Sequence, residues 1–194
     1  MPRSSQQGPI EQGERAIRAG YEQYGVEGFY QRFGDTYRNP HEQAIWAALG
    51  KAIECWHIPL DHVLDLACGS GEVTLALREL GASAVDGIDP YTHRAYAERS
   101  GQVAERYTFE QIAAGALAGR SYSAIICSFA LHVVAPSRLP ALAAQLSLIS
   151  DTLLVLTPHK RPVLKPDWGW DCAGELLVDR VRARYYRRSY GNFE

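Results

Sequence analysis

The sequence predicts an α/β protein, with a doubly wound, mostly parallel sheet and helices on both faces. From residue 62 onward, short apolar runs alternate with segments of helical periodicity. The first run ends in Gly69–Ser70–Gly71, and the second ends in Asp89–Pro90. Strands and helices that alternate at this spacing are typical of right-handed crossovers between parallel strands. We expect an antiparallel C-terminal edge strand to complete this Rossmann-like sheet.

Length and composition fit one globular domain. The chain has 194 residues, 46% of them hydrophobic and 22% charged, and its net charge is -2. At ~150 residues per domain this is one domain with short additions. A charge so close to zero gives no global attraction to a polyanion, so nucleic-acid binding is not expected. The four cysteines form no C-x-x-C pair and the six histidines lack zinc-site spacing, so we expect reduced thiols, no metal and a cytoplasmic location.

The N-terminal part is expected to precede the sheet as a helical layer. Residues 1–9 are polar and predict a disordered tail, residues 10–58 a helical lid or cap, and residues 59–194 the core. Residues 10–24 are rich in helix formers, whereas residues 24–38 are aromatic without a clean period. In Asn39–Pro40–His41–Glu42, Asn is a typical N-cap and Pro a typical first helical residue, so a second helix should begin there. No apolar run suggests a signal peptide or a membrane span.

The core elements follow in order. We expect strands over residues 63–67, 84–88, 107–112, 122–128 and 152–156, and helices over 72–80, 90–100 and 139–149. The run over 122–128 is apolar throughout, which is typical of a strand buried on both faces. Residues 158–174 contain three prolines and predict a loop. Residues 175–189 predict a single antiparallel edge strand, whose arginines would be solvated.

A candidate ligand site lies at the carboxyl ends of the first two strands. The glycines at 69 and 71 allow a sharp turn and a close approach of ligand to backbone, but residue 74 is Thr, so a dinucleotide fingerprint is incomplete. Asp65 would repel a pyrophosphate and suit an ammonium group. Asp89 is placed to accept both hydroxyls of a ribose. These features predict a ligand with a ribose, no phosphate and a cationic end, and S-adenosylmethionine has all three.

On these residues the chain resembles the small, single-domain class I S-adenosylmethionine-dependent methyltransferases. Residues 65–71 are similar to the acidic, glycine-rich first motif of the family, Asp89 to its ribose-binding acid, and residues 128–132 to its fourth-strand motif. The resemblance covers about residues 60–160 and implies S-adenosylmethionine as cofactor and S-adenosylhomocysteine as product. It departs from the family in having one convincing strand after residue 174 and no Asn-Pro-Pro-Tyr signature. The cofactor-binding residues that it implies are Asp65, Ala67, Gly69, Ser70, Gly71, Asp89, Pro90, Glu110, Gln111, Ile112, Ser128 and Phe129.

The resemblance also implies an in-line attack on the sulfonium methyl, in which the enzyme mainly positions the reactants. His132 is the first candidate for a base, and the alternative is that it only packs or hydrogen-bonds near the cofactor. His159 and Lys160 would orient an anionic substrate or lie in a solvated loop.

In similar enzymes the N-terminal segment covers the cleft as a lid. Tyr37 or Arg38 would then bind the cofactor carboxylate, and Tyr24, Tyr30 and His41 would face the acceptor. The alternative is that these aromatic rings attach helices to the sheet. The leading prediction for function is methyl transfer to an oxygen or nitrogen of a small molecule. A protein or RNA acceptor, or a fold that binds the cofactor without methylating, are the alternatives, and the oligomeric state stays open.

Overall fold

The computed structural model describes residues 14–190, so the predicted tail lies outside the described residues. The helices are α1 (Glu14–Phe33), α2 (Glu42–Trp56), α3 (Glu72–Glu79), α4 (His93–Ser100), α5 (Phe109–Ala113) and α6 (Leu139–Ser147), with 3-10 turns η1 (Gly34–Thr36), η2 (Leu131–Val133) and η3 (Pro166–Trp168). The strands are β1 (Val63–Leu66), β2 (Val85–Ile88), β3 (Ala124–Ser128), β4 (Thr152–Thr157), β5 (Trp170–Val178) and β6 (Val181–Arg188).

The six strands form one mixed sheet, which confirms the predicted fold class. Their order is β2-β1-β3-β4-β6-β5. The first four are parallel, and β6 and β5 run antiparallel to their neighbours. The chain winds outward from β1 to β2 and then returns to β3 on the other side of β1. Ligands in such sheets bind at this switch point, beyond the carboxyl ends of the strands.

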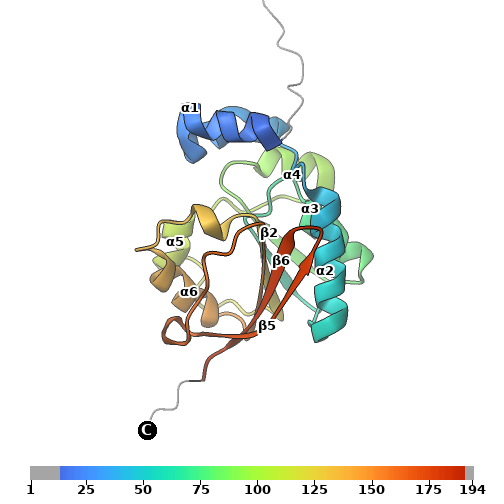
Figure 1. Ribbon diagram of the computed structural model, residues 1–194, viewed down its shortest axis with the longest axis vertical. Helices are drawn as coiled ribbons and strands as arrows, with labels where there is room; N and C mark the ends of the chain where they lie inside the picture. The colour runs from blue at the N-terminus through green and yellow to red at the C-terminus, as the bar shows by residue number, and fades with distance from the viewer. Residues whose placement is uncertain (1–13, 191–194) are drawn as a thin grey trace, which may run out of the picture.

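Helices cover both faces of the sheet, and each face has its own apolar core (Figure 1). Alternate residues of a strand point to opposite faces. Leu64 and Ile125 therefore pack on the side of α5 and α6, whereas Val63 and Ile126 pack on the side of α2 and α3. This double burial explains why the central strands are apolar at nearly every position.

The predicted strand over residues 107–112 is wrong, because this segment begins a helix. The Thr108 Oγ1 accepts the Gln111 backbone N–H at 3.3 Å, and the Gln111 Oε1 accepts the Thr108 N–H at 2.9 Å. This capping box starts α5. On the outer side of β2, in the described chain, strand pairing is limited to a single parallel bridge between Ile88 of β2 and Glu105.

The prediction of a single edge strand over residues 175–189 is also wrong, because the C-terminus forms a hairpin. β5 starts at Trp170, inside the predicted loop, and it is β5 that forms the edge. β6 lies between β4 and β5, so its Arg184 is buried rather than solvated. The Arg184 Nε donates to Glu175 at 2.7 Å, and its other nitrogens donate to the carbonyls of Pro162 and Lys160.

The N-terminal residues 14–41, here called the cap, lie at one end of the molecule next to α4 (Figure 1). α1 continues through the stretch predicted as irregular and is interrupted by non-helical backbone at Gly25. The 3-10 turn η1 packs on α4, where Arg94 pairs with Asp35 at 2.8 Å. The Asn39 Oδ1 accepts the His41 N–H at 3.0 Å, and α2 begins one residue later, at Glu42.

Candidate active site

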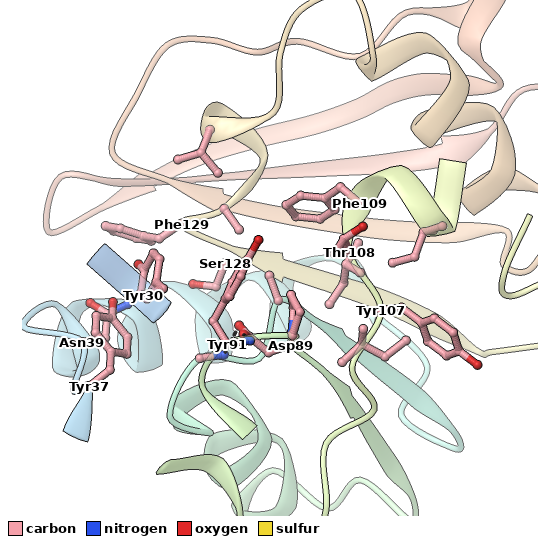
Figure 2. A pocket seen from close by; sticks show the side chains of 18 of the residues that line it. Tyr30, Tyr37, Asn39, Asp89, Tyr91, Tyr107, Thr108, Phe109, Ser128 and Phe129 are labelled. Atoms are coloured by element: carbon pink, nitrogen blue, oxygen red, sulfur yellow. Dashed lines mark hydrogen bonds between the residues drawn. The ribbon is translucent and has the colours of Figure 1, made fainter. Parts of the chain in front are cut away.

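A cavity of about 380 Å³ lies at the carboxyl ends of the central strands. Its walls come from β1, β2 and β3, from the segment that leads into α5, and from the cap. Figure 2 shows Tyr30, Tyr37 and Asn39 at one end, Tyr107 at the other, and Asp89 and Ser128 between them. Within the described part of the chain, its lining holds the carboxylates of Glu72, Asp89 and Glu110 and no Lys, Arg or His.

The predicted glycine turn forms the floor of this cavity. Gly69 and Gly71 have φ values of 56° and 86°, which favour glycine. The Gly69 N–H donates to Asp89 Oδ2 at 3.3 Å. A Cβ on Gly69 would lie 3.1 Å from Glu72 Oε1, so this glycine sits between two carboxylates. A larger residue here would press on Glu72 and would be strained at this φ.

Asp89 is buried at the end of β2 and faces the cavity. Its Oδ1 accepts the backbone N–H groups of Tyr91 at 2.8 Å and Thr92 at 3.0 Å. These bonds fix the carboxylate, and α4 begins only at His93 rather than at Pro90. Burial raises the pKa of Asp89, while its backbone donors oppose that rise.

The two acidic residues at the glycine turn face different surroundings. Asp65 is fully buried and does not line the cavity, because its carboxylate accepts the Thr74 hydroxyl at 2.7 Å. Burial raises the pKa of Asp65 to about 8. Glu72 does line the cavity, and it accepts hydrogen bonds from Ser70 at 3.1 Å and from the Asn39 side chain. Burial raises the pKa of Glu72 as well.

The end of β3 places a hydroxyl and a ring in the cavity wall. The Ser128 Oγ is buried and has no hydrogen-bond partner among the described residues. Phe129 follows it with a φ of 52°, which is unusual for a residue with a side chain. Its ring stacks on His41, with the ring centroids 5.1 Å apart. The last residue of the cap, His41, therefore packs against the Phe129 ring.

Tyrosines of the cap close one end of the cavity. The Tyr30 ring lies 5.2 Å from Tyr37 and 6.3 Å from Tyr91, and its hydroxyl is 2.6 Å from that of Tyr21. Burial raises the pKa of Tyr30 and Tyr37, so both phenols stay neutral. This end of the cavity offers ring faces and hydroxyls but no positive charge.

Half of the residues predicted for the site line the cavity: Tyr30, Tyr37, Ala67, Gly69, Asp89, Pro90, Glu110, Ile112, Ser128 and Phe129. The others lie outside its lining: Tyr24, Arg38, His41, Asp65, Ser70, Gly71, Gln111, His132, His159 and Lys160. Sequence reasoning missed Asn39, Glu72, Tyr91, Thr108 and Phe109, among others. An acid directly after the glycine turn was a visible signal for Glu72, and a Thr-x-x-Gln capping box was one for Thr108.

The histidines predicted for the rim form a pair beside the cavity. The rings of His132 and His159 are 4.5 Å apart, and the His132 Nδ1 is buried without a hydrogen bond in the described structure. Burial and the neighbouring His159 lower the pKa of His132 to about 4. Lys160 contributes its carbonyl to Arg184 rather than its ammonium to the cavity.

Residues 14–190 lack two features that are found in other classes of protein. No cluster of three or more His, Cys, Asp or Glu side chains is arranged to hold a metal ion there. None of the helices in the same range has the length and apolar character needed to cross a membrane.

One comparison with known proteins names a family, and another finds a relative along most of the chain. The profile of a methyltransferase domain matches residues 63–149. An uncharacterized protein of Schizosaccharomyces pombe is 32% identical in an alignment of 230 positions, gaps included, which spans 89% of this chain and 92% of that protein.

Solved structures share the fold at low identity. Magnesium protoporphyrin IX methyltransferase from Synechocystis PCC 6803, crystallised with S-adenosylmethionine, is 19% identical with a TM-score of 0.58, covering 90% of this chain and 96% of that one. The ribosomal protein L11 methylase of Lactobacillus delbrueckii subsp. bulgaricus is 17% identical with a TM-score of 0.56, covering 79% and 81%. On the methyltransferase-domain match and the shared mixed sheet, the chain belongs to the class I S-adenosylmethionine-dependent methyltransferases.

Proposed function

We propose that this enzyme transfers a methyl group to an oxygen or nitrogen of a small molecule. The observation that carries the proposal is the cavity, which is closed at one end by the cap and measures about 380 Å³. Pockets for small ligands range over roughly 300–1,000 Å³, so with the cofactor bound this one would leave room for only a small acceptor group. Such a cavity favours a small acceptor over a protein or RNA, which remain the alternatives.

The residues of the cavity fit the cofactor. S-adenosylmethionine supplies an electrophilic methyl group on a positively charged sulfur. The cavity lining of the described chain contains the buried carboxylates of Glu72 and Asp89 and no cationic side chain. The Arg99 guanidinium, outside the lining, opposes the rise in the pKa of Glu72, and a cationic ligand inside the cavity would add to that effect.

Asp89, at the end of β2, would separate the part of the cavity that holds the adenine from the part that holds the methionine. Asp89 would accept the ribose hydroxyls, and the adenine would then lie by Pro90, Phe109 and Ile112, with Glu110 at the exposed mouth. The backbone of residues 67–71 would pass under the methionine part. Tyr30 and Tyr37 would cover it from the cap, which would act as a lid.

Glu72 would bind the methionine ammonium, the role that the sequence predicted for Asp65. The Asp65 carboxylate is held by Thr74 outside the cavity lining, whereas Glu72 is buried and faces the cavity beside Gly69. Asp65 would then act through the shape of the glycine turn and the start of α3.

Two ligands separate these roles. S-adenosylhomocysteine carries the amino-acid part, and 5′-methylthioadenosine lacks it. We expect Glu72→Gln to weaken S-adenosylhomocysteine binding about 5- to 150-fold, because a charge-assisted hydrogen bond is worth roughly 1–3 kcal/mol, and to leave methylthioadenosine binding within twofold. Asp89→Asn should weaken both ligands. Isothermal titration calorimetry measures the four affinities, and Glu79→Gln on the exposed end of α3 is the control.

Other results would contradict parts of the proposal. Equal losses of both ligands in Glu72→Gln would remove Glu72 from the ammonium site. Failure of the unmodified enzyme to bind S-adenosylhomocysteine would contradict the cofactor site as a whole. Incubation of a size-fractionated extract with methyl-tritiated S-adenosylmethionine tests the acceptor, and label confined to macromolecules would defeat the small-molecule assignment.

A further inference from the structure

We propose that Arg99 is a positioning residue for cofactor binding: through the Ser70 hydroxyl it holds Glu72 in place and in its charged form, ready for the ammonium group of the cofactor. This inference rests on the proposed function, because it adds a residue that acts through Glu72 of that same site. Arg99 lies on α4, outside the cavity lining. The inference also gives Ser70, predicted from the sequence as a cofactor contact, an indirect role.

Arg99 connects α4 to the start of α2 and to the glycine turn. Its Nη2 donates to the carboxylate of Glu42, the first residue of α2, and its Nη1 donates to the Ser70 Oγ at 3.5 Å. The side chain of Arg99 is 21% exposed and that of Glu42 is 29% exposed, so salt screens this ion pair less than a pair on the open surface. Glu42 therefore holds the Arg99 guanidinium next to the turn.

The Ser70 hydroxyl links Arg99 to Glu72. An arginine only donates hydrogen bonds, so the Ser70 Oγ accepts from Arg99 and directs its own proton towards an acceptor. That acceptor is the Glu72 Oε2, which lies 3.1 Å from the Ser70 Oγ. Both residues are buried, so water does not compete for the bond between them. The link therefore favours one orientation of the Glu72 carboxylate, beside Gly69.

The positive charge of Arg99 acts against the negative surroundings of Glu72. The Glu72 charge raises the pKa of its titratable neighbours, among them Tyr37, Asp65 and Cys68. Burial raises the pKa of Glu72 itself, and the Arg99 charge opposes that rise. Without Arg99, Glu72 would take up a proton at a higher pH, and a neutral carboxyl group attracts an ammonium group only weakly.

Two ligands isolate Glu72 from the rest of the cavity. S-adenosylhomocysteine carries the ammonium group and 5′-methylthioadenosine lacks it, so the ratio of their affinities reports on the ammonium site. Asp89, whose pKa is also raised, would contact the ribose that both ligands share, so its titration cancels in the ratio. Isothermal titration calorimetry measures the ratio between about pH 5 and pH 8, the range in which a raised carboxyl pKa falls. Thermal unfolding checks that each variant is folded.

We expect the ratio to fall towards low pH as Glu72 takes up a proton, and Arg99→Met to move this fall upward by about one pH unit. At the acidic end of the range, S-adenosylhomocysteine should therefore bind Arg99→Met about tenfold more weakly than the unmodified enzyme. Methylthioadenosine binding should stay within twofold. Arg99→Lys keeps the positive charge and should restore the pH profile to within about half a pH unit.

A double-mutant cycle shows whether Arg99 acts through Glu72. In the Glu72→Gln background, Arg99→Met should change the ratio by less than twofold, because the group on which Arg99 acts is already neutral. Arg94→Met is the matched control, since Arg94 lies on the same helix but pairs with Asp35 of η1 rather than with the glycine turn. It should leave the ratio and its pH profile unchanged.

Ser70→Ala tests the link between Arg99 and Glu72. It removes the hydroxyl and keeps the Arg99 charge, so S-adenosylhomocysteine should bind about 2- to 10-fold more weakly, the value of one hydrogen bond. Methylthioadenosine binding should stay within twofold. Unchanged binding of S-adenosylhomocysteine would contradict a role for Ser70.

Several outcomes would overturn the inference. An unchanged pH profile in Arg99→Met, or a loss that is equal for the two ligands, would show that Arg99 has no role in positioning Glu72. The same loss in the Glu72→Gln background would show that Arg99 does not act through Glu72. A failure of the proposed function is distinct, because the unmodified enzyme would then not bind S-adenosylhomocysteine, or Glu72→Gln would weaken both ligands equally.

Discussion

Three buried carboxylates, those of Asp65, Glu72 and Asp89, surround the glycine turn, and burial raises the pKa of each. Asp65 feels both of the others. A turn built in this way is electrostatically costly until a cation arrives. Asp65 is the least exposed of the three carboxylates, so its ionisation gives the clearest measure of this electrostatic cost.

Stability should fall as the pH rises through the range in which Asp65 ionises. Its pKa is about 8 in the folded chain, whereas an unfolded aspartate has a pKa of about 3.9. The folded state therefore binds more protons between these values, and the free energy of unfolding decreases with increasing pH. We expect Asp65→Asn to flatten this decrease between about pH 4 and pH 8. Urea unfolding of both proteins at a series of pH values measures it.

Asp65→Asn must be compared with the unmodified protein, because His132 makes stability depend on pH in the opposite direction. Its lowered pKa makes stability fall as the pH drops below the ordinary histidine range. Asp61→Asn, at an exposed position before β1, is the control and should follow the unmodified protein. A parallel pH dependence of Asp65→Asn and the unmodified protein would show that Asp65 is ionised in both states.

At the scale of single residues, the sequence predicted what is local. The glycine turn and Asp89 were found because strand, turn and helix are adjacent in the chain. Which acid faces the cavity was not predictable, because it depends on Thr74, which holds Asp65 away from it. The aromatic wall from the cap comes together only in the folded chain.

At the scale of elements, the parallel strands β1, β3 and β4 were predicted close to their ends because burial on both faces makes them mostly apolar. β5 was missed for the opposite reason. Most of its residues are exposed at the edge of the sheet, and acidic and small residues such as Asp171 and Gly174 hide the strand pattern. The strand predicted over 107–112 failed because a capping box outweighs the apolar residues around it.

The docking of the cap on α4 has a steric test at Gly34. A Cβ there would lie 2.5 Å from the carbonyl oxygen of Tyr91, a backbone atom that cannot turn away. We expect Gly34→Ala to displace the cap from Tyr91, to raise the dissociation constant of S-adenosylhomocysteine several-fold and to lower the melting temperature. Calorimetric titration and thermal unfolding measure the two effects.

Gly50→Ala is the matched control for Gly34→Ala. Gly50 lies inside α2 with open space where the Cβ would be, so alanine should stabilise the helix by up to about 1 kcal/mol. Its affinity for S-adenosylhomocysteine should stay unchanged. Unaltered affinity in Gly34→Ala would mean that the cap does not shape the cofactor site.

At the scale of the whole molecule, the C-terminal hairpin joins the sheet to α2 at some distance from the cavity lining. Gly174 lies so close to Trp56 that a Cβ would be 2.7 Å from the indole nitrogen, and Trp56 stacks on Tyr185 with centroids 5.4 Å apart. None of these residues lines the cavity of the described chain. Stability and ligand binding should therefore be separable here.

A substitution of Arg184 tests whether stability and ligand binding are separable. Arg184 is 4% exposed and links Glu175 of β5 to the carbonyls of Pro162 and Lys160. Its loss leaves the two carbonyls without this donor, whereas Glu175 keeps its ion pair with Arg182. Because Glu175 is still partly solvated, we expect Arg184→Met to lower the free energy of unfolding by about 2–3 kcal/mol, less than the full cost of breaking a buried pair. Arg187→Met, at an exposed position of the same strand, should change it by less than about 0.5 kcal/mol. Both variants should bind S-adenosylhomocysteine within twofold of the unmodified enzyme at a temperature where they remain folded. A large loss of affinity in Arg184→Met alone would mean that the loop after β4, which Arg184 holds, shapes the active site in the folded enzyme.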